Sequence, residues 1–269
     1  MLRYAVNISI LLKEYPFYER FQRAAQAGFG AVEFLSPFEF DLEQVVAAKE
    51  AAGVEVVQFN TDCGNMAAGD RGFLNDPGKR EYWRRNLLDS LALARRLGAR
   101  QINSLAGNHM EGLSRQEELD CVAENLRWAV PGLEEAGLYL NLEVLNPFDN
   151  PCYLLTHSSK ALAMIHQVGS DRIRLQYDIY HIQRCQGNLV EGFKAMLPFI
   201  GHVQVADSPG RHQPGTGEIN YRYVLQAIED SGYTGFVSLE YNPLGSSEES
   251  FAWLSREKRR AATAADLRL

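Results

Sequence analysis

Short apolar runs alternate with longer amphipathic stretches along the whole chain. Eight of these runs are five to seven residues long and rich in Val, Ile, Leu, Tyr and Phe, a composition typical of buried strands. The predicted strands are Tyr4–Ile8, Ala31–Leu35, Val54–Phe59, Arg100–Leu105, Leu138–Val144, Ile173–Asp178, His202–Ala206 and Phe236–Glu240. Runs of this kind, separated by helical stretches, indicate parallel strands joined by crossover helices.

The stretches between the strands carry apolar residues at helical spacing and charged residues on the other face. The predicted helices are Phe17–Gln26, Asp41–Ala51, Gly78–Leu97, Ser114–Glu135, Ser158–Val168, Leu189–Phe199 and Tyr221–Asp230. Several end at a glycine, as at Gly53, Gly98 and Gly137, which is a common helix stop. The repetition predicts an α/β fold in which residues 1–254 form a single (β/α)8 TIM barrel, the catalytic domain. We expect the tail, residues 255–269, to be a solvated terminal helix or a frayed end.

Two connections are long and rich in Gly, Asn and Asp. They cover Asn60–Gly78, after the third strand, and Asp207–Ile219, after the seventh. Long loops in a compact domain are often functional, for instance as lids over a site, although they can also be simple surface excursions. Both readings stay open at this point.

Polar side chains mark the ends of four consecutive strands. Glu143 lies near the end of the fifth, Asp178 ends the sixth and Glu240 the eighth, while Gln204 lies within the seventh. The C-terminal ends of barrel strands surround the active-site mouth, so these oxygen donors should converge there. Three carboxylates and an amide in one place repel one another unless protons or a cation compensate them. The donor set favours a divalent metal ion, with Mg or Mn preferred and Zn or Co as alternatives.

Composition narrows the class of protein further. The net charge of −7 and the absence of a basic stripe before the tail argue against nucleic acid as a partner. No apolar run approaches the roughly 18 residues of a membrane span, and no signal peptide is evident, so we expect no membrane partner. The cysteines, which are Cys63, Cys121, Cys152 and Cys185, form no Cys-x-x-Cys pair. Scattered thiols favour a reduced, cytoplasmic protein. The oligomeric state, a homo-oligomer included, stays open.

Several motifs together resemble the hydroxypyruvate isomerase family of the xylose isomerase-like barrels. The resemblance runs from about residue 2 to about residue 254. It is carried by Asn7-Ile8-Ser9, Ala31-Val32-Glu33-Phe34-Leu35, Glu143, Asp178-Ile179-Tyr180-His181, Gln204, Gly215-Thr216-Gly217-Glu218-Ile219-Asn220-Tyr221 and Glu240. It implies that Glu143, Asp178, Gln204 and Glu240 bind the metal and that Glu143 and Glu240 also transfer protons. Many relatives have a histidine at the position of Gln204. The glutamine of this chain favours the hydroxypyruvate-type branch over the sugar epimerases.

The implied reaction is the isomerisation of hydroxypyruvate to tartronate semialdehyde through an enediolate. A carboxylate removes the proton from C3 and a carboxyl group returns a proton to C2, while a metal ion can stabilise the negative charge. Which of Glu143 and Glu240 acts as the base is not decided by the sequence. The substrate is expected to be a small oxo acid.

Further residues are candidate substrate contacts. His181 follows Asp178 beyond the strand end, and Asn60 and Asn108 follow the third and fourth strands. Arg211, in the loop after the seventh strand, is the preferred partner of the substrate carboxylate. Glu33 is expected to support the site from behind. His202 shares the strand face of Gln204, and we interpret it as a barrel-interior histidine.

Alternative functions remain. Gly215-Thr216-Gly217 resembles hydroxypyruvate isomerases, whereas Phe59-Asn60-Thr61 resembles the sister group that acts on 2-oxo-tetronates. A ketose 3-epimerase would use the same metal and paired glutamates. An apurinic endonuclease of this superfamily would need several zinc-binding histidines and a basic face, which six histidines and an acidic balance do not favour. A binding module without activity would have no reason to keep two mutually repelling glutamates.

Overall fold

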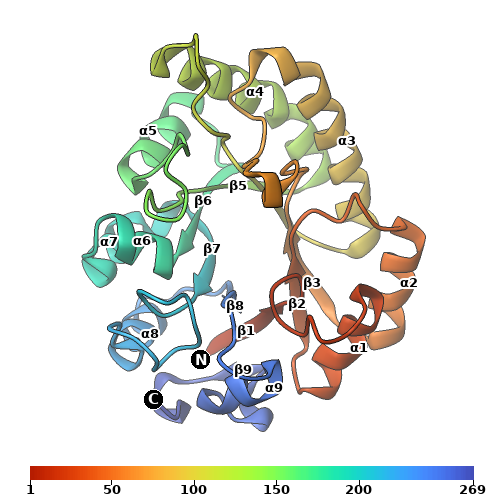
Figure 1. The fold of residues 1–269 in the computed structure, drawn as a ribbon, viewed down its shortest axis with the longest axis vertical. Coiled ribbons are helices and arrows are strands. Elements are labelled where there is room, and N and C mark those ends of the chain that lie inside the picture. Colours follow the sequence, from red (N-terminus) through yellow and green to blue (C-terminus); the bar gives the residue numbers. More distant parts are fainter.

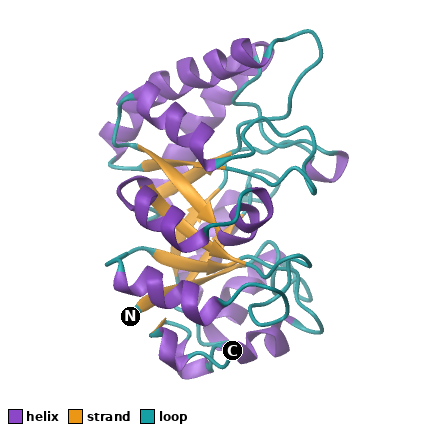
Figure 2. Ribbon diagram, turned by 90° about the vertical axis from the view of Figure 1, so that its left-hand side faces the viewer, coloured by secondary structure: helices purple, strands orange, loops and turns teal.

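A ring of helices surrounds a central barrel of parallel strands in the computed structural model, which describes residues 1–269 (Figure 1). Seen from the side, the strands run through the middle and many of the longer loops gather at one end (Figure 2). The strands are β1 (Leu2–Asn7), β2 (Ala31–Phe34), β3 (Glu55–Phe59), β4 (Gln101–Ser104), β5 (Tyr139–Glu143), β6 (Ile173–Asp178), β7 (Ile200–Val205) and β8 (Phe236–Leu239). Each overlaps one of the eight predicted strands.

The sheet closes on itself between its first and last strands. The strand order is β3-β2-β1-β8-β7-β6-β5-β4, so β1 pairs with both β2 and β8. Between β3 and β4 the ladder is reduced to one parallel bridge, from Asn60 to Asn103. The prediction of a single (β/α)8 barrel is confirmed.

The helices cover the outside of the barrel. They are α1 (Phe17–Gln26), α2 (Leu42–Ala52), α3 (Arg80–Leu97), α4 (Arg115–Ala136), α5 (Ser158–Val168), α6 (Ile179–Cys185), α7 (Leu189–Met196), α8 (Tyr221–Asp230) and α9 (Ser247–Ser250). Short 3-10 turns occupy Met66–Ala68, Pro77–Lys79, Leu197–Phe199, Phe251–Trp253, Arg256–Lys258 and Ala264–Asp266. None of the helices combines the length and apolar character needed to span a bilayer. A buried apolar cluster of 71 residues packs the helices against the barrel.

The apolar pattern did not predict helix α6 or the four-residue helix α9. Helix α6 begins directly after β6, because the Asp178 carboxylate accepts hydrogen bonds from the backbone N–H groups of Tyr180 and His181 at 2.8 and 3.2 Å. Such N-capping satisfies donors that a helix start leaves free. The cap fixes the place of His181 relative to Asp178.

The tail corrects a prediction. Residues 255–269 are docked on the barrel, so the expectation of a solvated helix or frayed end is wrong. Strand β9 (Ala261–Ala262) pairs antiparallel with the start of β1, and Leu267 is buried. An ion pair of 2.9 Å joins Lys258 to Asp266. The alanine-rich sequence has low strand propensity, so its pairing depends on Leu2 and Arg3 at the start of β1, where β2 does not pair, and local sequence does not reveal this.

The barrel interior is unusually polar for this fold, in which branched apolar side chains normally fill the centre. Amide, carboxyl and imidazole side chains occupy it instead. They are Asn7, Glu33, Gln58, Asn103, Asn141, Gln176, His202 and Gln204, and all are buried. Buried polar groups are stable only when hydrogen-bonded, so this interior must form a network.

Candidate active site

The four strand-end oxygen donors predicted from the sequence lie at the same end of the barrel. Glu143 and Asp178 are the last residues of β5 and β6, Gln204 lies in β7, and Glu240 follows β8. In the parallel register Asp178 is level with Gln204. All four side chains are buried. Burial without neutralisation would make this group electrostatically unfavourable.

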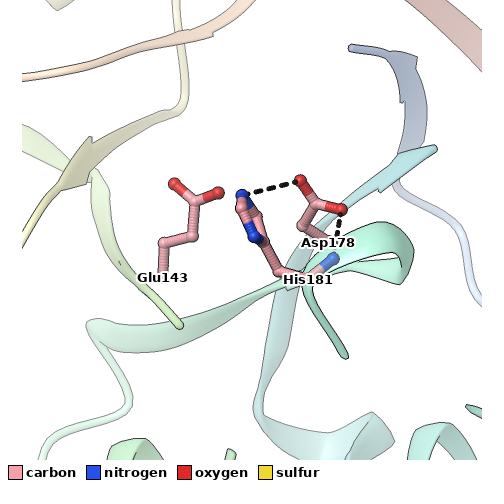
Figure 3. A group of neighbouring side chains, drawn as sticks. All are labelled: Glu143, Asp178 and His181. Carbon is pink, nitrogen blue, oxygen red and sulfur yellow. Dashed lines mark hydrogen bonds and ion pairs between the residues drawn. The ribbon is translucent and has the colours of Figure 1, made fainter. Parts of the chain in front are cut away.

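Glu143, Asp178 and His181 form the tightest group of candidate metal ligands. Figure 3 shows the His181 imidazole between the two carboxylates. One ligand atom from each residue lies within 4.8 Å of the others. The Asp178 Oδ2 atom is buried and has no hydrogen-bond partner, and the His181 Nε2 atom is 3.8 Å away. An orphaned carboxylate oxygen beside a second carboxylate fits a divalent cation.

Charge repulsion and burial shift the carboxyl groups of the site. Burial, followed by the negative charge of Asp178, raises the pKa of Glu143 to about 8. Burial also raises the pKa of Asp178, and it raises that of Glu240 well above the ordinary value. Without a cation the group therefore retains protons near neutral pH.

The proton of His181 is placed by its neighbours. Burial, and then the charges of Arg211 and Arg71, hold the pKa of His181 well below its usual range, so the ring is neutral. Its Nδ1 atom accepts a hydrogen bond from the backbone N–H of Asn146 at 3.1 Å. A neutral ring that accepts at Nδ1 carries its proton on Nε2. The Nε2–H therefore points a donor toward the site, which suits a substrate oxygen better than a metal ion.

Glu240 is held by an arginine and an asparagine. The Arg211 Nη2 atom lies 2.8 Å from Glu240 Oε2 and 3.9 Å from Asp178 Oδ2. Asn7, at the end of β1, donates from Nδ2 to Glu240 Oε1 at 2.9 Å and to Glu33 Oε1 at 3.1 Å. Arg211 thus compensates carboxylates of the protein, whereas the sequence suggested the substrate carboxylate as its partner.

The position of Arg211 depends on how its loop folds. The Asp207 carboxylate accepts hydrogen bonds from the backbone N–H groups of Gly215, Thr216 and Gly217 at 2.9 to 3.0 Å. These bonds fold the Asp207–Ile219 connection into a compact turn. The loop is thus an ordered support that presents Arg211 to the site.

Gln204 belongs to a directional chain of amides across the barrel. Asn141 donates to Gln58, Gln58 to Gln176, Gln176 to Gln204 and Gln204 to Glu33, with distances of 2.6 to 3.0 Å. Each amide accepts at its oxygen and donates from its nitrogen, so the orientation of Gln204 is fixed from both sides. Its oxygen keeps a second lone pair.

Glu33 ends this chain as an anion. Burial raises its pKa, but the neighbouring His202 and hydrogen bonds from Gln204 outweigh burial and leave the pKa below its ordinary value. His202 Nε2 lies 2.6 Å from Glu33 Oε2, and both residues are buried. His202 is therefore a barrel-interior histidine, as its strand position indicated, and Glu33 supports the site from behind.

Glu143 and Glu240 line a small cavity of about 80 Å³. His181, Asn60 and two arginines also line it. The arginines are Arg71 and Arg211. Pockets for drug-sized ligands are several hundred Å³, so this cavity fits a compact molecule of few carbons. A larger cavity of about 570 Å³ lies at the opposite end of the barrel, where Arg3 and Phe236 line it, and none of the strand-end acids reaches it.

Asn108 is placed outside the small cavity. Its Nδ2 atom donates to the carbonyl of Gly69 at 2.9 Å, which ties the β4–α4 connection to the loop after β3. In that loop Gly72 has φ +85°, and a Cβ atom there would lie 2.4 Å from the carbonyl oxygen of Leu105. The Asn60–Gly78 loop thus packs closely over the mouth.

Three residues of the site have no counterpart among the sequence candidates. Asn7 holds Glu240, and Asn103 donates to Glu143 Oε2 at 2.9 Å. Arg71 lines the cavity from the loop after β3. The positions of Asn7 and Asn103 at strand ends offered a usable signal, because the same rule identified Glu143. Arg71 lies within a loop, where spacing predicts no direction.

Comparison with known proteins agrees with this geometry. The profile of the xylose isomerase-like TIM barrel family matches residues 21–257. A hydroxypyruvate isomerase of Escherichia coli is 40% identical over 254 residues, covering 94% of this chain and 98% of that protein. A 2-oxo-tetronate isomerase of Haemophilus influenzae is 34% identical and covers 96% of this chain and 100% of that protein.

A solved structure is also similar throughout. The crystal structure of a Brucella melitensis protein, described as an AP endonuclease of family 2, is 37% identical with a TM-score of 0.90 and covers 94% of this chain and 98% of that one. Together with the two isomerases, it matches the barrel over nearly its whole length. The chain belongs to the hydroxypyruvate isomerase family within the xylose isomerase-like TIM barrels, and it is an isomerase.

Proposed function

We propose that this protein converts hydroxypyruvate to tartronate semialdehyde (2-hydroxy-3-oxopropanoate). The observation that carries the proposal is the pair of buried glutamates, Glu143 and Glu240, which line one small cavity from different strands. The 40% identity to a hydroxypyruvate isomerase supports it. The cavity volume of about 80 Å³ suits a three-carbon substrate.

The two glutamates supply the proton transfers. One carboxylate takes the proton from C3, which leaves an enediolate, and the other group delivers a proton to C2, while the C3 hydroxyl proton moves to the oxygen on C2. Both carboxyl groups are buried and line the cavity that would hold the substrate, so each can exchange a proton with it. The roles of base and acid can be exchanged, because the reaction runs in both directions.

We further propose Glu143, Asp178, Gln204 and Glu240 as ligands of a divalent metal ion, with Mg or Mn preferred over Zn or Co. When bound, such an ion would stabilise the negative charge of the enediolate as a Lewis acid. The orphaned Asp178 Oδ2 and the free lone pair of Gln204 support this set. Glu240 would then share its carboxylate between the ion and Arg211.

Three residues of the cavity are proposed substrate contacts. His181 would donate from Nε2–H to an oxygen that becomes negative during the reaction, as preorganised donors do in other isomerases. Asn60 and Arg211 line the same space. Asn108 would act indirectly, because its side chain holds the loop after β3, which carries Arg71 at the cavity wall. These contacts would orient the hydroxy-carbonyl group toward the glutamates.

A 2-oxo-tetronate isomerase is the second candidate. The 34% identical relative supports it, and so does Phe59-Asn60-Thr61 at the end of β3, where Asn60 lines the cavity. A ketose 3-epimerase is less consistent with a cavity of this size. We retain a cytoplasmic location as a proposal, since all four cysteines are free.

The decisive experiment is an assay of the purified, metal-reconstituted protein, with the product resolved by proton NMR. Hydroxypyruvate, a 2-oxo-tetronate and a free ketose should be compared with Mg, Mn, Co and Zn. We expect the highest kcat/KM with hydroxypyruvate. A higher value with the 2-oxo-tetronate would establish the second candidate, and no turnover of any oxo acid would refute both.

A further inference from the structure

The two arginines of the cavity differ in how their charges are compensated. Arg211 faces carboxylates of the protein, with its Nη2 atom 2.8 Å from Glu240 and 3.9 Å from Asp178. Arg71 forms three hydrogen bonds, and every acceptor is neutral. Nε donates to Asn150 Oδ1 at 2.6 Å, and Nη1 donates to the carbonyls of Met66 and Asp70 at 3.1 and 2.6 Å. Arg71 is therefore a cation without a counter-ion.

The surroundings of Arg71 make this lack of a counter-ion significant. Its side chain is partly buried at the cavity wall, where water screens charge less than at an open surface. Arg71 lines the same cavity as Glu143 and Glu240. A partly buried guanidinium is stabilised by a carboxylate, which accepts charge-assisted hydrogen bonds from its free N–H groups. The Nη2 group donates no hydrogen bond to the protein and is available for this purpose.

The position of the Arg71 guanidinium is fixed from two sides of the mouth. Its own loop is held by the bond from Gly72 N to the carbonyl of Cys63 at 2.9 Å and by Asn108. Asn150, which accepts from Nε, lies on the connection between β5 and α5. Arg71 thus spans two loops above the glutamates. A rigid placement of this kind lowers the entropy lost on binding.

We propose that Arg71 binds the carboxylate of the substrate and determines the preference for 2-oxo acids over neutral ketoses. The inference rests on the proposed function and deepens it. With the carboxylate at Arg71, the remaining carbons would extend toward Glu143 and Glu240, where the proton transfers take place. Arg211 keeps Glu240 oriented, so the two arginines have separate tasks.

The test compares two substrates that differ at one end. Hydroxypyruvate carries a carboxylate where dihydroxyacetone carries a hydroxymethyl group, and both contain the same hydroxy-carbonyl unit. For Arg71→Met we expect kcat/KM for hydroxypyruvate to fall about 100-fold or more, largely through KM, with less than about a threefold change for dihydroxyacetone. Arg71→Lys keeps the charge but loses the hydrogen bonds to Asn150, Met66 and Asp70 that fix the side chain, so its loss should be intermediate.

Two further variants serve as comparisons. Arg85→Met removes an exposed arginine of α3 that forms no ion pair, so kcat/KM for both substrates should stay unchanged. Arg211→Met should lower kcat/KM for both substrates to a similar extent, because it removes the arginine that holds Glu240. Thermal melting of each variant checks that it folds. The proposal would be overturned if Arg71→Met lowered kcat/KM equally for both substrates, or for neither.

Calorimetry separates this inference from the proposed function. Glycerate carries a carboxylate but has no carbonyl and cannot isomerise, and glycerol is its neutral counterpart. We expect glycerate to bind the wild type and to lose that binding in Arg71→Met, even if no oxo acid is turned over. Equal binding of glycerate by both proteins would overturn the role of Arg71. A wild type that neither binds glycerate nor turns over an oxo acid would overturn both proposals.

Discussion

Asn7, the last residue of the first strand, donates a hydrogen bond of 2.9 Å to Glu240, which follows the last strand. The closure of the barrel therefore also orients a candidate proton carrier. The same Nδ2 group binds Glu33, so one amide joins the interior network to the mouth.

Replacing Asn7 tests this link. Asn7→Asp would add a third carboxylate between Glu33 and Glu240 and should lower kcat by roughly 100-fold, because the oriented donor becomes a repelling acceptor. Asn7→Ala should lower it less, by about tenfold. Steady-state kinetics measures both, and a kcat for Asn7→Asp above that of Asn7→Ala would contradict the explanation.

The two glutamates should be individually indispensable. Glu143→Gln and Glu240→Gln keep the size and part of the hydrogen bonding of each side chain but cannot carry a proton, so we expect kcat to fall by at least about 1000-fold in each. Single-turnover kinetics with saturating metal separates this from weaker substrate binding. Near wild-type turnover in both variants would refute the proton-transfer roles.

Metal removal should destabilise the protein. At a metal concentration of 100 times Kd, binding contributes about 2.7 kcal/mol, which for a chain of this size corresponds to a rise in Tm of roughly 5–10 °C. Chelation should abolish both the rise and the activity. Differential scanning calorimetry with and without Mn measures the shift.

Asp178→Asn is the matched control for that shift. It keeps the cap of α6 partly intact but removes the charge of the orphaned oxygen, so the metal-dependent rise should disappear while the metal-free Tm changes little. An undiminished rise in this variant would place the ion elsewhere.

Glu33 should contribute more to stability than to chemistry. Glu33→Ala leaves His202 and the amide of Gln204 without an acceptor inside the barrel, and we expect a loss of about 3–5 kcal/mol in the free energy of unfolding. Glu33→Gln keeps an acceptor oxygen and should lose less. Urea unfolding of the two variants measures the difference, and equal losses would contradict the network.

The docked tail should respond to acid through Asp266. Its hydrogen bond with Lys258, and then those from Thr263, lower its pKa from 3.8 to about 2. A depressed folded-state pKa means that the stabilisation is complete above pH 3.8 and is lost as the pH falls through about 2. The difference in unfolding free energy between wild type and Asp266→Asn should therefore shrink from pH 4 to pH 2. A constant difference across this range would contradict the contact.

Much of the fold and of the site follows from local sequence. The eight strands were predictable because short β-rich runs alternate regularly with amphipathic helical stretches, and Glu143, Asp178 and Glu240 were predictable because barrel strands end at the mouth. Substrate contacts were harder to predict. Arg211 reaches Glu240 because of how its own loop folds, and Asn108 contacts Gly69 in a neighbouring loop, and the sequence encodes neither arrangement locally.

Other features depend on pairings between distant segments. The direction of the Gln204 amide is set by Gln176 and Glu33, which lie on different strands, and Asn7 meets Glu240 only when the sheet closes. The tail was misjudged for the same reason, since Ala261–Ala262 becomes a strand only against β1. Such contacts are properties of the closed barrel.

The two chain termini differ in their distance from the catalytic mouth, which matters when the protein is attached to a surface. The chain begins at the end of β1 that points away from the catalytic mouth, and Met1 is exposed apart from an ion pair with Glu229. Leu269, by contrast, lies close to Gly215 in the loop that carries Arg211. An anchor at the N-terminus would therefore leave the mouth facing the solution, whereas one at the C-terminus would crowd it, so a biosensor or packed-bed reactor should use the N-terminal linkage.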